Sequence, residues 1–211
     1  MEKAKLKIQL FKQREQDILD AALDLLINHG EDKVTVEQIA IKVDIGKGTI
    51  YKHFASKTEI YYRLLFDYEF SLKAKLEEAI DQSDGGDYSA PARVYFSGRM
   101  EDPLKARLFQ RLEEKMIFNG EESDKLAELE KIRLQTIEKI NQCFGRRIDE
   151  GLLKEAPPYY YYMAYWALTH GAVELYHNHY CKSVVDDMDG LMGFIMDAGV
   201  HMGLNHSSGK K

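Results

Sequence analysis

Apolar residues recur with helical spacing along almost the whole chain. Ile18, Ala22, Leu25 and Leu26 share one face of a segment that Gly30 would end, as in an amphipathic helix. No segment shows the clear alternation typical of a strand, and no internal repeat is visible. The pattern predicts helices over residues 12–29, 36–43, 47–54, 57–82, 92–97, 103–118, 123–151, 158–181 and 184–204. We therefore expect an all-α fold.

Local signals mark several ends of these helices. Thr35 followed by Gln38, and Ser56 followed by Glu59, are capping-box pairs that open helices. A cluster of helix breakers over residues 81–91 predicts a loop. Residues 206–211 are expected to form a frayed tail.

Composition indicates a soluble globular protein. The chain has 211 residues, of which 45% are hydrophobic and 30% charged. Its two cysteines, Cys143 and Cys181, form no disulfide framework and suit a reducing cytosol. The first ten residues are too charged for a signal peptide, and no apolar run reaches the roughly 18 residues of a membrane span. These features predict a cytoplasmic location and no membrane partner.

Charge is distributed unevenly along the chain. The net charge is −6, yet residues 1–62 contain ten basic and ten acidic side chains, so the remainder carries the whole excess. Five basic residues lie near the start and face only Glu2; they are Lys3, Lys5, Lys7, Lys12 and Arg14. This local placement predicts a basic N-terminal arm and leaves a nucleic-acid partner open, because distribution matters more than the total.

The stretch GKGTIYKHF, residues 46–54, has the glycines and cations of an anion-binding surface. It is not a P-loop, because Lys47 is followed by Gly48 instead of Ser or Thr and Ile41 occupies the position of the first glycine. Two short helices joined by a tight turn at residues 44–46 instead predict a helix-turn-helix. Its inward set is Val36, Ile39, Ala40, Ile45, Ile50 and Phe54, packed against Leu25 and Leu26; its outward set is Lys47, Thr49, Tyr51, Lys52 and His53. Gly48 would let the helix approach a duplex closely.

Three segments together, residues 35–40 (TVEQIA), 45–54 (IGKGTIYKHF) and 56–60 (SKTEI), closely resemble the DNA-binding domain of TetR-type transcriptional regulators. The resemblance covers roughly residues 10–66 and implies that Lys47 and Thr49 face base edges or nearby phosphates. Thr35, Tyr51, His53 and Lys57 would contact the phosphate backbone, and Lys52 could do either. Two positions depart from the family pattern: Asp44 stands where the turn commonly has glycine, and Gly46 replaces the usual Ser or Ala at the start of the recognition helix.

The resemblance implies a three-helix DNA-binding domain with its basic arm at residues 1–62, and a helical effector-binding and dimerisation domain at residues 63–205. A mostly apolar cavity would bind a hydrophobic or aromatic effector that releases the protein, most simply a repressor, from operator DNA. Its candidate lining residues are Tyr95, Phe96, Phe109, Leu112, Met116, Ile137, Phe144, Tyr162, Trp166 and His170. The candidate homodimer surface consists of Ala164, Ala167, Leu168, Gly171 and Leu175 on one helix and Met188, Met192, Ile195, Met196 and Gly199 on the next.

Two other functions remain open from the residues alone. His170, Glu174 and His177 share one helical face and could hold a metal in a helical-bundle enzyme, although no nucleophile–base pair is identifiable. The second alternative function is that of an architectural DNA-binding protein without an effector. The long acidic C-terminal part speaks against it, because this part is larger than a dimerisation element needs to be. We expect no catalytic activity and no metal or other cofactor. In the aromatic run at residues 158–166, four consecutive tyrosines cannot share one environment, because a helix spreads them around its circumference.

Overall fold

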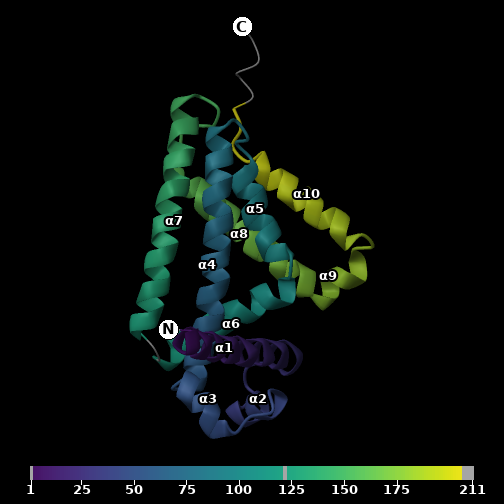
Figure 1. Ribbon diagram of the computed structural model, residues 1–211. Helices are drawn as coiled ribbons and strands as arrows, with labels where there is room; N and C mark the ends of the chain where they lie inside the picture. The colour runs from purple at the N-terminus through teal and green to yellow at the C-terminus, as the bar shows by residue number, and fades with distance from the viewer. Residues whose placement is uncertain (1, 121–122, 206–211) are drawn as a thin grey trace. The chain divides into compact units, whose positions relative to one another are not determined.

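The computed structural model describes residues 2–120 and 123–205, and within them the all-α prediction is confirmed (Figure 1). The helices are α1 (Glu2–His29), α2 (Val36–Lys42), α3 (Lys47–His53), α4 (Lys57–Asp84), α5 (Ala90–Met100), α6 (Pro103–Asn119), α7 (Ser123–Asp149), α8 (Pro158–His177), α9 (His179–Val184) and α10 (Met188–Val200). Among the described residues, no helix is both long enough and apolar enough to cross a lipid bilayer. The predicted frayed tail lies outside the described residues.

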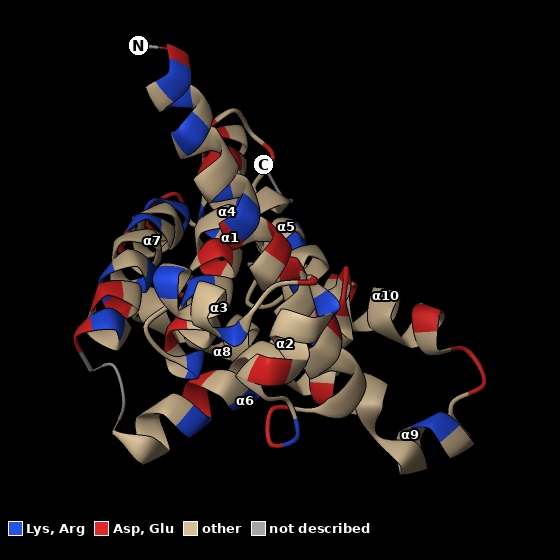
Figure 2. Cartoon of the chain, turned by 60° about the horizontal axis from the view of Figure 1, so that its bottom comes forward, with Lys and Arg blue, Asp and Glu red and all other residues tan. Residues whose placement is uncertain are grey.

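Several boundaries differ from the prediction. The basic N-terminal stretch is not an extended arm but the first turns of α1, and its lysines are exposed (Figure 2). The helix predicted over residues 158–181 is interrupted at Asn178, whose backbone is extended. The side chain of Asn178 caps α9 by accepting a hydrogen bond from Cys181 N at 3.1 Å. Similarly, α10 begins only at Met188, where Asp187 caps Gly190 N at 2.8 Å. Asn and Asp are favoured caps, so both restarts left a sequence signal that the apolar spacing concealed.

The chain forms two compact units. The N-terminal unit consists of the described residues of 1–68 and 108–127, and the C-terminal unit of those of 69–107 and 128–211. Most of α6 and the start of α7 therefore group with the first three helices. The predicted domain division after residue 62 stays a prediction.

The core of the N-terminal unit holds the two short helices in place. Ile39 of α2, Ile50 of α3 and Phe54 are each at most 2% exposed, and Ile18, Leu19, Ala22 and Leu26 of α1 are buried as well. Burying each large apolar side chain contributes about 1.5–3 kcal/mol. The predicted inward set is confirmed for Val36, Ile39, Ala40, Ile50 and Phe54, whereas Ile45 is only half-buried.

The predicted capping box at Thr35 forms in full, and the one at Ser56 forms only in part. Thr35 Oγ1 accepts from Gln38 N at 3.2 Å, while Gln38 Oε1 accepts from Thr35 N at 2.8 Å. Ser56 Oγ accepts from Glu59 N at 2.9 Å, but the Glu59 carboxylate accepts from Ala55 N rather than completing the box.

The turn between α2 and α3 is a Schellman motif. Asp44 N donates to Ile41 O at 3.1 Å and Ile45 N donates to Ala40 O at 3.0 Å, which satisfies the last carbonyls of α2. Asp44 has a φ of +53°, so this residue takes the left-handed conformation for which glycine is the usual choice. Asp is among the few other residues that tolerate it. Gly46 starts α3 without a side-chain cap.

The loop between α1 and α2 is fastened by side chains from two other helices of the N-terminal unit. Lys57 Nζ donates to Val34 O at 2.6 Å and Glu31 O at 3.1 Å, and Tyr61 OH donates to Glu31 O at 3.1 Å. From α6, Arg111 pairs with the Glu31 carboxylate at 3.3 Å and Lys115 pairs with Asp32. This loop leads directly into Thr35, so these contacts fix where α2 begins.

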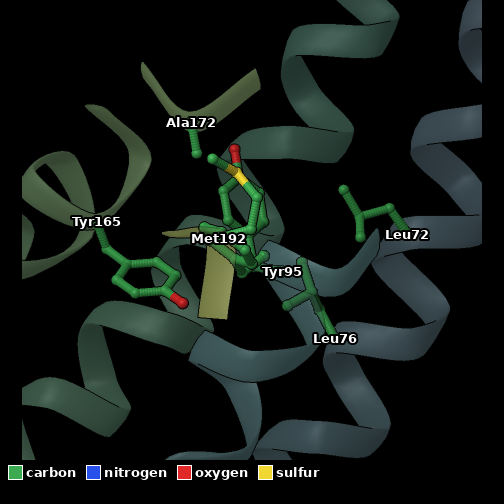
Figure 3. Packing of buried hydrophobic residues seen from close by; sticks show 7 residues of the cluster. Leu72, Leu76, Tyr95, Tyr165, Ala172 and Met192 are labelled. Atoms are coloured by element: carbon green, nitrogen blue, oxygen red, sulfur yellow. The ribbon is translucent and has the colours of Figure 1, made fainter. Parts of the chain in front are cut away.

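The C-terminal unit has a core of aliphatic and aromatic side chains from four helices. Figure 3 shows Tyr95 and Met192 between Leu72 and Leu76 on one side and Tyr165 and Ala172 on the other. Close backbone approach completes this core at Gly199, where a Cβ would lie only 2.3 Å from Cε2 of Tyr165. Helices α5, α8 and α10 therefore pack against one another, with Gly199 on the inner face of α10.

A buried ionic group lies in the same unit. The Glu69 carboxylate accepts hydrogen bonds from Arg99 at 3.1 Å and from Arg133 at 3.0 Å, and Glu69 and Arg99 are both buried. Burial opposes ionisation of Glu69, but the two guanidinium groups outweigh it and hold the pKa of Glu69 below its usual range. The carboxylate is therefore ionised at neutral pH.

Candidate nucleic-acid interface and ligand cavity

The second helix of the helix-turn-helix presents polar side chains to solvent. Lys47, Gly48 and Lys52 are exposed, Tyr51 is 48% exposed, and Thr49 is half-buried. Thr35 is exposed at the start of α2. The sequence-predicted outward face of α3 is thus present for Lys47, Tyr51 and Lys52, and partly for Thr49.

His53 departs from the prediction that it faces outward. Its ring packs on Phe11 with centroids 4.1 Å apart, its Nδ1 lies 3.9 Å from Glu15 Oε1, and its side chain is only 7% exposed. The physical reason is helical spacing: His53 follows the fully buried Ile50 by three residues and so shares its inward face. The outward placement of His53 is therefore wrong.

Lys57 has an intramolecular role that the sequence did not indicate. Its ammonium donates to the Glu31 and Val34 carbonyls and lies 5.4 Å from the centre of the Tyr61 ring. A phosphate contact by Lys57 stays a prediction, but its side chain also positions the α1–α2 loop. A Lys57 variant that loses DNA binding therefore does not by itself demonstrate a phosphate contact, because the α1–α2 loop also loses two hydrogen bonds.

Packing within the protein does not explain why glycine occupies position 48. A Cβ built on it would meet nothing within 4 Å, and its backbone is helical, so any residue could fold there. Glycine in a helix interior costs about 0.5–1 kcal/mol relative to alanine. The open space above Gly48 fits the expectation that another molecule approaches α3 there.

A cavity of about 50 Å³ lies within the C-terminal unit. Tyr95, Phe144, Tyr162 and Trp166 line it, as predicted. His170 does not line it but contacts two of these residues: its Nε2 lies 3.3 Å from Tyr95 OH, and its ring stacks on Trp166 at 4.0 Å. Half of the predicted lining is therefore in or beside one cavity.

The remaining predicted lining residues lie elsewhere. Phe109, Leu112 and Met116 are each at most 1% exposed and belong to the N-terminal unit, where they fill the core. Phe96 is buried in the C-terminal core, and Ile137 is half-buried but does not line the cavity. Aromatic or apolar character alone does not separate core from cavity, because both positions favour it.

Sequence reasoning missed Tyr88, Arg147, Tyr161 and Tyr165 as cavity residues. A signal existed for two of them: Tyr161 and Tyr165 lie one turn apart and directly precede Tyr162 and Trp166. Tyr161 and Tyr165 are buried whereas Tyr159 and Tyr160 are exposed, which confirms that the consecutive tyrosines have different environments.

Burial controls the protonation of the groups around the cavity. It raises the pKa of Tyr95, Tyr162 and Tyr165, so these hydroxyls remain neutral. Burial, with a further contribution from Arg99 and opposition from Glu69, lowers the pKa of His170 to about 4. His170 is therefore a neutral imidazole at physiological pH.

The proposed metal-binding face of α8 is not assembled. Glu174 pairs with Arg107 at 3.2 Å, while His170 stacks on Trp166. In the part of the chain that the structure describes, no cluster of three His, Cys, Asp or Glu side chains could hold a metal ion. The enzyme alternative loses the residue arrangement that motivated it.

On α8, part of the predicted dimer surface is exposed, whereas its role in dimerisation stays a prediction. Ala164, Ala167 and Gly171 are exposed, while Leu168 and Leu175 are half-buried. On α10 the stripe is wrong: Met192 and Gly199 are buried, and Met188, Ile195 and Met196 pack against the core. The outer face of α10 instead carries Gly190, Phe194 and Ala198, with Phe194 71% exposed.

Comparison with known proteins identifies the helix-turn-helix. The family model described as "Bacterial regulatory proteins, tetR family" matches residues 18–64. The "Uncharacterized HTH-type transcriptional regulator TtgW" of a Pseudomonas putida strain is 37% identical over 54 residues, which cover 26% of this chain and 40% of that protein. The "HTH-type transcriptional regulator SrpR" of Pseudomonas putida is 38% identical over 50 residues, 24% of each protein. Each match thus spans less than half of the curated relative.

Solved structures share the whole fold at low identity. A tetR-family regulatory protein from Rhodococcus RHA1 has a TM-score of 0.70 and 16% identity, covering 90% of this chain and 96% of that one. PfmR, a TetR family transcriptional regulator from Thermus thermophilus, has a TM-score of 0.62 and 18% identity over 90% and 96% of the two chains. A structure described as superantigen PfiT also matches, with a TM-score of 0.65 and 15% identity over 91% and 96%. The fold alone therefore does not define function.

The all-α fold and the capped helix-turn-helix with an exposed polar face define a helix-turn-helix regulatory protein. Residues 18–64 of this chain match the helix-turn-helix of the tetR family of bacterial regulatory proteins.

We predict that Gly48→Ala separates stability from DNA binding. The variant should raise the free energy of unfolding by about 0.5–1 kcal/mol, because alanine is the better helix former and its Cβ meets no protein atom. The same methyl group should lower affinity for duplex DNA about tenfold, equivalent to about 1.4 kcal/mol. Chemical denaturation and fluorescence anisotropy measure the two effects. Unchanged DNA affinity would show that no molecule approaches α3 at Gly48.

We predict that His170 makes the protein less stable in acid. The unfolded chain binds a proton on this residue below about pH 6.5, whereas the folded protein does so only near pH 4. Stability attributable to His170 is thus fully present above pH 6.5 and lost as pH falls towards 4. His170→Gln should lose less of its unfolding midpoint between pH 7.5 and pH 5 than the native chain does. His179→Gln, at an exposed position, is the control and should follow the native chain.

Proposed function

We propose that this protein is a sequence-specific DNA-binding transcriptional regulator that acts in the cytoplasm, most simply as a repressor. The observation that carries the proposal is the helix-turn-helix itself. Its α2 is capped at Thr35, its turn is closed by the Schellman motif, and its α3 exposes Lys47, Tyr51 and Lys52. A helix held in this way can enter a major groove and keep its orientation there.

The side chains of α3 divide by reach and chemistry. Lys47, at the first turn of α3, is in position to donate to base edges, where Lys commonly reads guanine. Lys52 lies at the other end of the same helix, and Tyr51 exposes about half of its surface beside it. We assign phosphate contacts to Tyr51 and Lys52, because contacts to the phosphate backbone set the register of the base contacts.

Release by a small hydrophobic or aromatic effector completes the proposal. Helix α4 has 28 residues, about 42 Å at 1.5 Å per residue, and its residues belong to both compact units. A ligand that repacks residues around its C-terminal part could therefore alter the position of its N-terminal part. Such a ligand must bind the DNA-incompetent arrangement more tightly, and operator DNA must weaken its binding by the same factor.

Two copies of the chain are needed for useful specificity, because α3 has only seven residues and touches few base pairs. We place the dimer surface on the outer faces of α8 and α10, which pack against each other within the C-terminal unit. Ala164, Ala167 and Gly171 allow close approach of a partner helix, and Phe194 offers a large apolar anchor.

The DNA-contact assignments predict different effects for two lysines. Preferred duplexes are first selected from a random pool, and their affinity is then measured at several salt concentrations. Lys52→Gln should weaken binding to all sequences alike and reduce the slope of log affinity against log salt by about one unit. Lys75→Gln, an exposed position of the C-terminal unit paired with Glu101, makes the same charge change and should leave the slope unaltered.

Lys47→Ala should instead change which sequences are selected. A uniform loss of affinity with an unchanged sequence preference would show that Lys47 contacts phosphate and that its base-reading role is wrong. Failure of the native protein to enrich any sequence would overturn the proposed function itself.

The dimer surface predicts that Phe194→Asp and Gly171→Arg each shift the protein from dimer to monomer in sedimentation at micromolar concentration. A buried charge at either site would lack a partner across the interface. Leu134→Asp is the matched control, because Leu134 is also exposed but lies on α7. A dimer that survives both α8 and α10 variants would place the interface elsewhere.

A further inference from the structure

The cavity of the C-terminal unit has one charged side chain in an otherwise mostly apolar wall. Aromatic rings and aliphatic side chains surround it, and Arg147 at the end of α7 is the charged residue among those that line it. A charge in such a place is costly unless something pairs with it. What Arg147 could pair with is therefore informative about the ligand.

The guanidinium of Arg147 is positioned but only partly used. Its Nη1 donates to Tyr88 O at 3.2 Å, and its carbon lies 5.3 Å from the centre of the Tyr88 ring. Its Nε is buried and has no hydrogen-bond partner among the residues that the structure describes. Since the group is planar, the bond from Nη1 leaves the opposite edge, Nε with Nη2, free to act as a two-donor fork.

The surroundings of Arg147 do not neutralise it. Burial lowers the pKa of Arg147, although an arginine remains protonated in any case. Glu150 is near enough to favour the charged form, but no described carboxylate lies within ion-pairing distance of this guanidinium. The edge formed by Nε and Nη2 matches the two oxygens of a carboxylate in spacing and charge.

The remaining walls suit a ring. The hydroxyl groups of Tyr161 and Tyr165 are occupied, donating to Lys154 O at 2.6 Å and Ala92 O at 2.8 Å, so these residues turn mainly ring surface to the cavity. Phe144 stacks on Tyr161 with centroids 5.4 Å apart. Aromatic side chains pair with a ligand ring in stacked or edge-to-face geometry.

We propose that this cavity binds a small aromatic carboxylate, with its carboxylate on the Nε–Nη2 edge of Arg147 and its ring among Phe144, Tyr162 and Trp166. This proposal rests on the proposed function, because it takes the cavity as the effector site. It narrows the class of effector to aromatic acids. The cavity of about 50 Å³ is smaller than the roughly 150 Å³ that holds benzene in a protein. The walls therefore open when the ligand binds.

Trp166 provides the measurement, because it lines the cavity and is the one tryptophan of the chain. The full-length protein is titrated with 3-phenylpropionate and, separately, with its uncharged amide, 3-phenylpropionamide, while Trp166 fluorescence is recorded. The acid should give a saturable change and bind about tenfold more tightly than the amide, as expected for a charge-assisted hydrogen bond. A negligible response to the acid, or equal affinities for acid and amide, would overturn the proposal.

Arg147→Met should lower the affinity of the acid about tenfold and leave that of the amide unchanged. Arg146→Met is the matched control, since Arg146 is the exposed neighbour and pairs with Asp84 instead of lining the cavity. Arg147→Lys retains the charge without the fork and should lose part of the preference for the acid, which keeps the test valid if Arg147→Met does not fold. An equal loss for acid and amide would assign Arg147 a purely structural role and overturn the proposal.

The proposed regulatory function is tested separately by repeating the selected-DNA titration with saturating 3-phenylpropionate. Weaker DNA binding in the native protein, and no such weakening in Arg147→Met, supports the acid as an effector. If the acid binds through Arg147 but DNA affinity stays the same, release by this site is overturned while the carboxylate site stands.

Discussion

Two helices of seven residues each cannot be stable in water on their own, because a helix of that length has a costly nucleus and few hydrogen bonds. Everything that α3 presents to DNA therefore depends on the burial of Ile39, Ile50 and Phe54 against the rest of the N-terminal unit. The apolar contacts hold α2 and α3 in place but do not set where they begin and end. The capping box at Thr35 and the Schellman motif at Asp44 do that, with hydrogen bonds that would otherwise be missing.

The same constraint explains why the α1–α2 loop has so many ties. A recognition surface is useful only if it keeps its orientation, and loops are normally the most mobile parts of a fold. Lys57 and Tyr61 of α4 bond to backbone carbonyls of this loop, and Arg111 and Lys115 of α6 bond to its carboxylates. The contacts from α6 are partly exposed ion pairs, each of which contributes little to the free energy of unfolding. Their main effect is therefore to position the loop. Both α4 and α6 also contribute residues to the C-terminal unit.

Periodicity and capping were sufficient to predict the fold class, most helix positions and the inward set of the helix-turn-helix. Local interactions dominate in helices, so a single sequence contains most of the required information. Asn178 and Asp187 were missed because side-chain caps restart helices inside a segment whose apolar spacing stays continuous. The prediction for His53 is wrong because its polar side chain favours the surface, whereas its three-residue spacing from Ile50 places it on the inward face.

The cavity was the least predictable feature, for a physical reason. Cavity walls and close-packed cores use the same apolar and aromatic residues, so Phe109 and Tyr162 could not be distinguished from their sequence positions. Arg147 could have been noticed only with the structure, because an arginine in the last turn of a helix is commonly a favourable partner of the helix dipole. Its burial beside Tyr88 is a tertiary property.

The small size of the cavity bears directly on how a ligand could regulate this protein. A ligand that binds every arrangement of the chain with the same affinity shifts no equilibrium. A ligand larger than the cavity must displace part of its wall, so its binding free energy depends on which arrangement is present. Trp166 is one of the more exposed wall residues, at 41%, and its ring stacks on His170. His170 in turn contacts Tyr95, whose ring packs in the α5–α8–α10 core beside Leu72 and Leu76 of α4. Trp166 is therefore connected to α4 through three contacts, by way of His170 and Tyr95.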